Sequence, residues 1–295
     1  MKGIRVLCAS LLALTLVAFT VCPVTVQVAA AVADMPSPGE RFLQVVAHPD
    51  DDLLFMSPDL YGAVAQGRPT VTVYLTAGEG TAGFDDERDP SVYVRDREDG
   101  VRAAYAYLAG VRNAWRSTPL KAGRLPLTMD TLVDRPRVRL VFARLPDGGD
   151  PRADGGRYAL TRLWKGGACV RVYLPGGPCV SREDVIAALH VLYVRFGSNV
   201  LRTLDPDPPL HTRRGDHPDH VASARFALAA LQGLRMRRAS YRGYPMTGWA
   251  PNVAARLREL KRQVFGEYTR HDYRVGGWRY RAWIERMYRI PDHGP

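Results

Sequence analysis

Short apolar segments typical of strands alternate with helix-like segments along most of this 295-residue chain. Runs of β-branched and other apolar residues at 42–47, 70–75 and 138–145 predict buried strands. Segments with apolar residues at helical spacing follow, such as 91–109 and 217–234. This alternation is typical of an α/β fold with a largely parallel sheet. Ligands of such sheets bind beyond the carboxyl ends of the strands.

Weaker patterns complete the expected order of elements. Residues 53–56 open a helical segment that we expect to continue to residue 65. Further helices are predicted at 181–196 and 253–268, and further strands at 199–204 and 239–244. The chain shows no internal repeat and no low-complexity block.

The first 33 residues are not expected to belong to the fold. Two basic residues precede an apolar run over residues 6–21, and Ala31-Val32-Ala33 fits a small-x-small cleavage site. This is the pattern of a secretory signal peptide. The alternative is an uncleaved anchor, because the run is near the lower length limit for a membrane-spanning helix. We expect residues 34–295 to form one secreted domain without stable membrane insertion.

Cysteine usage fits an exported protein. After signal cleavage only Cys169 and Cys179 remain, ten residues apart in a Gly- and Pro-rich stretch that is typical of a hairpin. In an oxidising compartment such a pair is expected to form a disulfide, and two unpaired thiols are the alternative. The pair does not predict a metal site, because no further His or Cys stands beside it at zinc-finger spacing.

The charge of the chain is strongly positive but not focused. There are 41 Lys and Arg against 30 Asp and Glu, a formal net charge of +11. The basic residues are scattered apart from short runs such as 235–238. Nucleic-acid binding would require a basic patch with interleaved aromatics or a known motif. We therefore expect no nucleic-acid partner, and no feature of the sequence indicates an oligomeric state.

Three consecutive carboxylates, Asp50, Asp51 and Asp52, follow His48 and Pro49 directly after the first predicted strand. Polar groups at a strand end are costly when they are buried without a partner, and a divalent cation can neutralise them. Zinc takes His nitrogen and Asp oxygen, so His48 and Asp51 can supply two ligands. Another carboxylate can then face a metal-bound water. The alternative is an Asp-rich turn that caps the following helix.

A second motif, His217-Pro218-Asp219-His220, opens a late helix. Proline fits the first helical position, so His217 is expected to cap the helix and His220 to lie in its first turn. Residues three apart share one helix face, so both histidines can converge on one site. Asp219 can orient an imidazole or raise its pKa. The alternative is a surface helix cap with incidental histidines.

Together these motifs resemble the PIG-L/LmbE-like deacetylase family, which includes N-acetylglucosaminylphosphatidylinositol de-N-acetylases. The shared features are the strand followed by residues 48–52, the Thr-Ala-Gly-Glu segment at 76–79, and residues 217–220. The resemblance covers about 42–272, with an unfamiliar insertion at about 115–180 that carries the cysteine pair. It implies a Rossmann-like three-layer fold with a mostly parallel sheet and one deacetylase domain.

The resemblance also implies the metal centre. His48, Asp51 and His220 would bind one Zn²⁺ per chain, although another divalent transition metal could replace it. Asp50 would be the general base on the metal-bound water. The family usually has Glu where this chain has Asp52, so the role of Asp52 stays open.

The remaining implied roles concern the substrate. A protonated His217 would stabilise the oxyanion or protonate the leaving amine, with support from Asp219. The family carries a substrate-contacting Arg early in the helix after the second strand. Arg97 is the best match and Arg95 the alternative, and either could be a solvated helix-face arginine.

These roles, together with the predicted signal peptide, predict a secreted metal-dependent hydrolase. It would remove an acetyl group from the amide nitrogen of an N-acetylglucosamine-type sugar in a glycan, glycolipid or glycosylated metabolite. A metal-dependent esterase on the same site is one alternative. A non-catalytic secreted carbohydrate-binding protein is the other.

Overall fold

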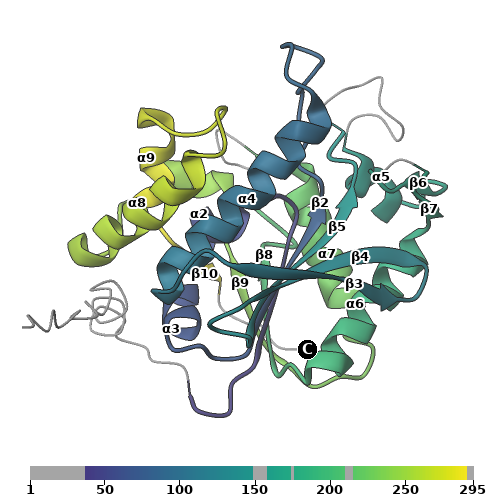
Figure 1. The fold of residues 1–295 in the computed structure, drawn as a ribbon, viewed down its shortest axis with the longest axis horizontal. Coiled ribbons are helices and arrows are strands. Elements are labelled where there is room, and N and C mark those ends of the chain that lie inside the picture. Colours follow the sequence, from purple (N-terminus) through teal and green to yellow (C-terminus); the bar gives the residue numbers. More distant parts are fainter. Residues whose placement is uncertain (1–36, 149–157, 174–175, 210–214, 291–295) are drawn as a thin grey trace, which may run out of the picture.

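The computed structural model describes residues 37–148, 158–173, 176–209 and 215–290, which are coloured by sequence in Figure 1. The predicted signal peptide, residues 1–33, lies outside this part of the chain. Within the described part, no helix is both long and apolar enough to cross a membrane.

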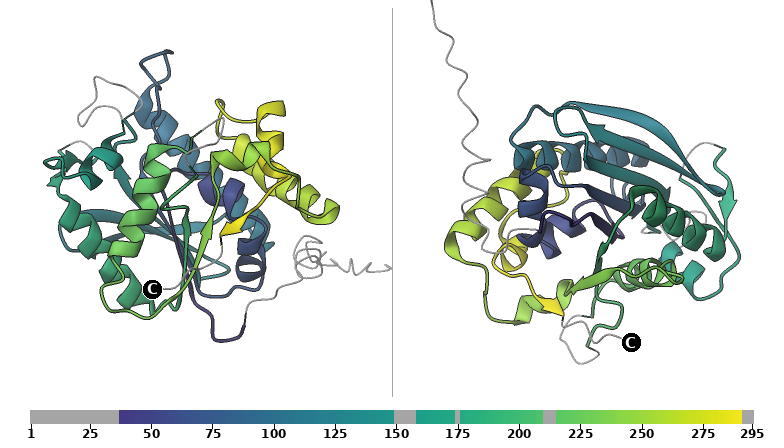
Figure 2. Two further views of the ribbon diagram at one scale, coloured as in Figure 1. Left: turned by 180° about the vertical axis from the view of Figure 1, so that it is seen from behind. Right: turned by 90° about the horizontal axis from the view of Figure 1, so that it is seen from below.

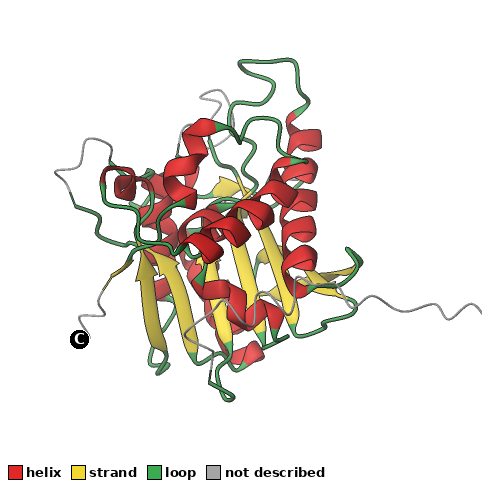
Figure 3. Cartoon of the chain, turned by 90° about the vertical axis from the view of Figure 1, so that its left-hand side faces the viewer, coloured by secondary structure: helices red, strands yellow, loops and turns green. Residues whose placement is uncertain are grey.

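A mixed sheet of eight strands forms the centre of the molecule (Figure 3), in the order β10-β9-β8-β1-β2-β5-β4-β3. The five central strands are parallel: β1 (Phe42–Val46), β2 (Thr70–Thr76), β5 (Val138–Leu145), β8 (Val200–Leu204) and β9 (Arg237–Tyr241). The edges are antiparallel: β3 (Trp115–Ala122) and β4 (Leu125–Leu132) at one, β10 (Arg289–Ile290) at the other. The chain continues from β1 to β2 on one side and later returns to β8 on the other. The strand order therefore reverses between β1 and β8, which is where ligands bind in such sheets.

The central strands are buried on both faces, which explains their almost continuous apolar sequences. Successive side chains of a strand point to opposite faces. In β1, Leu43 and Val45 accordingly join one hydrophobic cluster while Val46 joins the other. In β2, Val73 and Tyr74 divide in the same way.

Helices cover both faces of the sheet and create three layers (Figure 2). One layer contains α2 (Asp51–Phe55), α3 (Asp59–Ala65), α4 (Pro90–Ala109), α8 (Ala255–Thr269) and α9 (Trp278–Ile284). The other contains α5 (Ala159–Trp164), α6 (Arg182–Phe196) and α7 (Pro218–Ala229). The predicted Rossmann-like α/β fold with a mostly parallel sheet is therefore confirmed.

Helix ends follow local chemistry. Asp89 caps α4 by accepting from the N–H of Val92, and Gly110 ends it with φ 64°, a conformation that glycine adopts at little cost. The helix predicted to run to residue 65 is instead two helices, because the chain breaks at Pro58, which has no N–H to continue the ladder. The helix predicted to reach residue 234 ends at Ala229, ahead of a turn in which Gly233 has φ 85°.

The predicted disulfide is present. Cys169 and Cys179 are bonded, with a Cα–Cα distance of 5.4 Å. Cys179 begins β7 (Cys179–Val180), and Cys169 directly precedes its antiparallel partner β6 (Val170–Arg171); these two strands are separate from the main sheet. The strands β3, β4 and β5, within the region predicted as an insertion, belong to the main sheet. The limits of that insertion stay a prediction.

Candidate functional site

The two histidine motifs meet beyond the carboxyl ends of β1 and β8. His48 follows β1 directly, while His217 caps α7, which follows β8. The ring centroid of His48 lies 4.7 Å from that of His217 and 5.2 Å from that of His220. The structure therefore brings both predicted motifs into one cluster at the point where the strand order reverses.

The turn between β1 and α2 is strained at Asp50. This residue has φ 124° and ψ −20°, a conformation that side chains other than glycine rarely adopt and that costs on the order of 1–3 kcal/mol. The carbonyl of the preceding Pro49 accepts hydrogen bonds from Nη2 of Arg97 at 2.6 Å and from the hydroxyl of Tyr268 at 2.8 Å. Side chains of α4 and α8 thus hold the turn from outside.

The second motif has a relaxed backbone. His217 has extended φ and ψ angles and Pro218 occupies the first helical position, as predicted. The N–H of Asp219 donates to Nδ1 of His217 over 3.3 Å, so a neutral His217 carries its proton on Nε2. Burial, together with the nearby His48 and His220, lowers the pKa of His217 to about 3.

The predicted ligands His48, Asp51 and His220 lie together. Nδ1 of His48 is 3.3 Å from Oδ2 of Asp51, and Nε2 of His220 is 3.0 Å from Oδ1 of the same carboxylate. Nε2 of His220 is buried, yet it makes no hydrogen bond of acceptable geometry within the described part of the chain. Ligands about 2.0–2.2 Å from a tetrahedral zinc lie roughly 3.3–3.6 Å apart. The two separations from Asp51 are at or below this range, and ligand atoms of His48 and His220 lie within 4.8 Å of each other, so the three residues are close enough to bind one zinc-type cation after small adjustments.

Two carboxylates that were not among the predicted site residues orient the imidazoles of His48 and His220, the two predicted histidine ligands. Nδ1 of His220 lies 2.8 Å from Oδ1 of Asp216, and Nε2 of His48 lies 3.2 Å from Oδ1 of Asp147. Burial opposes charging of both rings, but Asp51 and Asp216 raise the pKa of His220 to about 9. Asp147 and Asp51 likewise raise that of His48. Such partners fix the orientation and tautomer of metal-binding imidazoles.

The sequence contains a feature that points to each of these two carboxylates, Asp147 and Asp216. Asp147 follows the third predicted strand just as Asp50 follows the first, and Asp216 directly precedes the second motif. The strand-end rule that selected the first motif would have selected Asp147 as well.

Asp219 is placed differently from the prediction. Its Oδ1 accepts hydrogen bonds from the N–H of Thr161 at 2.8 Å and from the Thr161 hydroxyl at 2.5 Å. Among the contacts of the described residues, Asp219 reaches His217 through its backbone N–H rather than through its carboxylate. Oδ2 of Asp219 is buried and has no partner among those residues.

Arg97 is buried and joins several parts of the site, whereas its alternative, Arg95, is exposed. Nη2 of Arg97 lies 3.2 Å from Oδ1 of Asp50, and Nη1 of Arg97 donates to the carbonyl of Gly78 at 2.7 Å. Burial raises the pKa of Asp50 to about 8, against the opposing charge of Arg97. These contacts of Arg97 with other parts of the protein hold the turn that contains Asp50 in place.

Asp52 has an anchoring role. It is fully buried and accepts hydrogen bonds from the hydroxyls of Tyr74 on β2 (3.2 Å) and Tyr105 on α4 (2.5 Å). Burial raises its pKa to about 6. These contacts tie the start of α2 to the sheet and to α4.

A cavity of about 310 Å³ opens beside the cluster. It is lined by Gly78, Gly80, Thr81, Tyr93, Arg97, Asp147, Gly148, Tyr158, His217 and Arg274. Its volume is at the lower end of the range for small-molecule sites, roughly 300–1,000 Å³.

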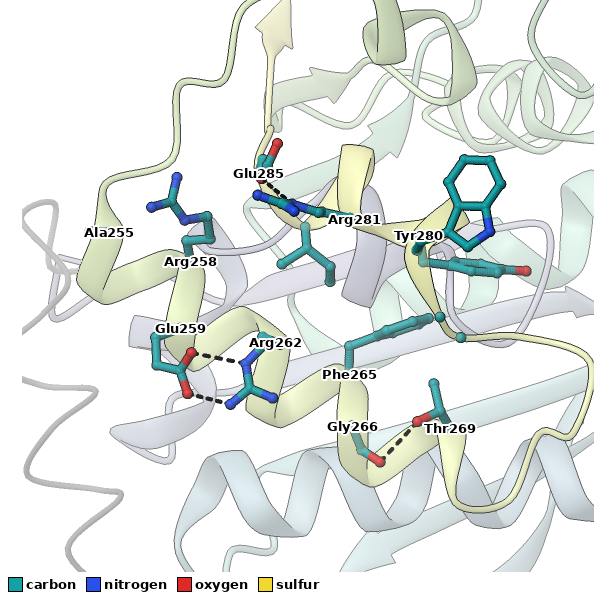
Figure 4. A pocket seen from close by; sticks show the side chains of 14 residues that line it. Ala255, Arg258, Glu259, Arg262, Phe265, Gly266, Thr269, Tyr280, Arg281 and Glu285 are labelled. Atoms are coloured by element: carbon teal, nitrogen blue, oxygen red, sulfur yellow. Dashed lines mark hydrogen bonds and ion pairs between the residues drawn. The ribbon is translucent and has the colours of Figure 1, made fainter.

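A larger cavity of about 780 Å³ lies between α8 and α9 (Figure 4). Phe265 and Tyr280 line it together with Arg262, which pairs with Glu259. It contains none of the predicted site residues. We place the chemistry at the smaller cavity, because the convergent imidazoles and carboxylates lie there.

The fold and this cluster define a member of a deacetylase family. The chain matches the family model "PIG-L: GlcNAc-PI de-N-acetylase" over residues 43–231 and belongs to that family. It is 32% identical over 232 residues to the 1D-myo-inositol 2-acetamido-2-deoxy-alpha-D-glucopyranoside deacetylase of Nakamurella multipartita. That match covers 77% of this chain and 61% of the relative, so the chain spans less than two thirds of the relative's length.

A solved structure shares the fold. The zinc-inhibited form of teicoplanin deacetylase Orf2 is 16% identical, with a TM-score of 0.50, and the match covers 83% of this chain and 90% of that one. At this identity the likeness supports the fold alone. The predicted family and fold are confirmed by these matches.

Proposed function

We propose that this protein is a metal-dependent N-deacetylase acting on an N-acetylglucosamine-type sugar. Membership of the PIG-L family supports the reaction class. The observation that carries the proposal is the buried carboxylate of Asp51, whose two oxygens face Nδ1 of His48 at 3.3 Å and Nε2 of His220 at 3.0 Å, so that three potential ligands converge. A cation held by these three residues would satisfy all of them.

Zinc is the proposed ion, bound by His48, Asp51 and His220. Their two imidazole nitrogens and one carboxylate form a donor set that leaves a fourth tetrahedral position open. When bound, such an ion supplies Lewis acidity to a water molecule and to the acyl carbonyl.

Asp50 is the proposed general base. It takes a proton from the attacking water as the water oxygen bonds to the acyl carbon. The guanidinium of Arg97, 3.2 Å from its Oδ1, favours the ionised carboxylate that can accept this proton, and positioned bases contribute roughly 10²–10⁴-fold. The proton then passes to the amide nitrogen as the C–N bond breaks, which leaves acetate and a free amine.

His217 is proposed to stabilise the negative charge on the acyl oxygen. Because the N–H of Asp219 occupies Nδ1, a neutral His217 presents its Nε2 proton as a hydrogen-bond donor. This differs from the protonated His217 of the sequence-based mechanism. One such donor typically contributes about 3–4 kcal/mol.

The substrate is proposed to be a 2-acetamido-2-deoxyglucoside, since the relative from N. multipartita is named for such a substrate. The small cavity places polar and aromatic side chains, among them Asp147, Tyr93 and Tyr158, next to His217. These can accept sugar hydroxyls and pack against a sugar ring. Secretion is part of the proposal on the strength of the apolar run at residues 6–21 and its cleavage site.

The test is an acetate-release assay on matched N-acetyl and O-acetyl glucosides, with and without a chelator. We expect acetate and free amine from the N-acetyl sugar, loss of activity on chelation and recovery with added zinc. Turnover of only the O-acetyl sugar would identify an esterase. Sugar binding without turnover would identify a carbohydrate-binding protein, and activity that resists complete metal removal would contradict the metal.

A further inference from the structure

His48 belongs to a second cluster of potential ligands on its other side. Its Nδ1 faces Asp51, whereas its Nε2 lies 3.2 Å from Oδ1 of Asp147. One ligand atom from each of His48, Asp147 and Asp219 lies within 4.8 Å of the others. The three residues come from the end of β1, the end of β5 and the first turn of α7, so the fold itself brings them together.

One member of this cluster is a buried carboxylate with a free oxygen. Asp219 is completely buried, and Thr161 binds only its Oδ1. Its Oδ2 has no partner within the described part of the chain. A buried acceptor without a donor costs about 1–3 kcal/mol, and more when it is charged. A cation between Asp219 and Asp147 would remove this cost.

The donor set and its access suit a divalent cation. One imidazole nitrogen and two carboxylates match the ligands that zinc accepts, and their two negative charges balance its charge. Asp147 and His217 line the 310 Å³ cavity, so an ion can enter from solvent by the same route as a substrate.

We propose that His48, Asp147 and Asp219 form a second, inhibitory zinc site. The inference rests on the proposed function in one respect, that the first ion is held by His48, Asp51 and His220. Both ions use the same imidazole through its two nitrogens, and the second must displace the Nε2 proton that faces Asp147. The second ion therefore binds more weakly than the first, and it inhibits because it lies beside His217 at the substrate cavity.

The first experiment counts ions on the full protein, with zinc as the only probe. Equilibrium dialysis with elemental analysis should give one zinc per chain at low free zinc and two at high free zinc. Even an outer partner of a metal ligand contributes about 10–100-fold to affinity. Asp219→Asn should weaken the second equivalent by at least about tenfold while keeping the first, whereas Asp147→Asn, which also removes the partner of His48 Nε2, should weaken both. The matched control Asp99→Asn, an exposed carboxylate on α4, should bind two ions as the wild type does.

The second experiment locates the ion and measures inhibition. Anomalous scattering from crystals soaked at high zinc should place it between Asp147 and Asp219. Excess zinc should inhibit the wild type, and Asp219→Asn should be inhibited less, each relative to its own activity at one equivalent. Thermal unfolding checks that each variant is folded.

Two outcomes would overturn the inference. One is a single equivalent at every zinc concentration. The other is a second equivalent that both variants retain, which would identify an adventitious ion only. Absence of the first equivalent would instead count against the proposed function, so the two failures are distinguishable.

Discussion

The same tripeptide, His-Pro-Asp, occurs twice in the site and is built in two different ways. At residues 48–50 it forms a turn with a strained Asp50, held by side chains from α4 and α8. At residues 217–219 it forms an unstrained helix start, in which the second residue is a favourable first helical proline. A shared sequence therefore does not imply a shared local structure.

The two motifs are held in their conformations by different parts of the chain. The second motif is shaped by neighbours in the chain, since Asp216 and the N–H of Asp219 orient its two histidines. The first depends on residues such as Tyr268, which lies more than 200 positions away. A strained conformation persists only where the surrounding structure over-determines it. The first motif should accordingly be sensitive to remote changes and the second to local ones.

The largest effect is expected from removing the base of the first motif. Asp50→Asn keeps the shape of the side chain but cannot accept a proton, so kcat should fall by about 10²–10⁴-fold. Zinc content should stay at one per chain. Both are measured on the best N-acetyl sugar and by elemental analysis, with Asp99→Asn as the control. A kcat within a few-fold of the wild type would remove Asp50 from the mechanism.

The next effect concerns pH and stability. The pKa of Asp52 is about 6 in the folded protein and 3.8 in its reference state. At a pH between these two values the carboxyl of Asp52 keeps its proton in the folded state and releases it in the unfolded state. The contribution of the protonated Asp52 to the free energy of unfolding is therefore complete below about pH 4 and is lost above about pH 6. It amounts to at most about 3 kcal/mol.

Asp52→Asn should lack this dependence. Urea denaturation from pH 4 to 7 should show the free energy of unfolding of the wild type falling relative to that of the variant. A constant difference across this range would show that Asp52 titrates normally.

Beside the second motif, Asp216→Asn should lower the affinity of the protein for zinc. It weakens the partner of His220 Nδ1, and such changes cost about 10–100-fold in metal affinity. Competition with a chelator measures the loss. The exposed Asp207 precedes the same helix, and Asp207→Asn should leave zinc affinity unchanged. Equal affinities for the wild type and Asp216→Asn would contradict this role.

The smallest effect tests the remote support of the first motif. Tyr268→Phe removes the hydroxyl that contacts the Pro49 carbonyl and the Asp272 carboxylate and accepts from Nε of Arg97, which should destabilise the fold by about 1–2 kcal/mol. It should also lower kcat about tenfold at full zinc occupancy, because Asp50 shifts. Tyr241→Phe, which removes a hydroxyl bound to Asp59, should cost stability but not kcat. Equal kcat values in the two variants would show that the first motif does not need this support.

The sequence predicted the parallel strands well because they are buried on both faces and carry uninterrupted apolar runs. It also predicted that His48 and His220 converge, since strand ends and helix starts meet at one edge. The break between α2 and α3 at Pro58 and the end of α7 at Ala229 depend on single turns that periodicity does not detect. Supports such as Tyr268 could not be predicted, because they result from tertiary packing between segments far apart in the chain.

The backbone of Asp50 also bears on how this protein could change over evolutionary time. Glycine at this position would relieve the positive φ, and the buried Arg97 would lose Asp50 but keep Asp272 as an ion-pair partner. Stability and activity often trade off at active sites in this way. The strained backbone of Asp50 is thus a local cost to the fold, and under the proposed function its carboxylate would be the reason that this cost persists.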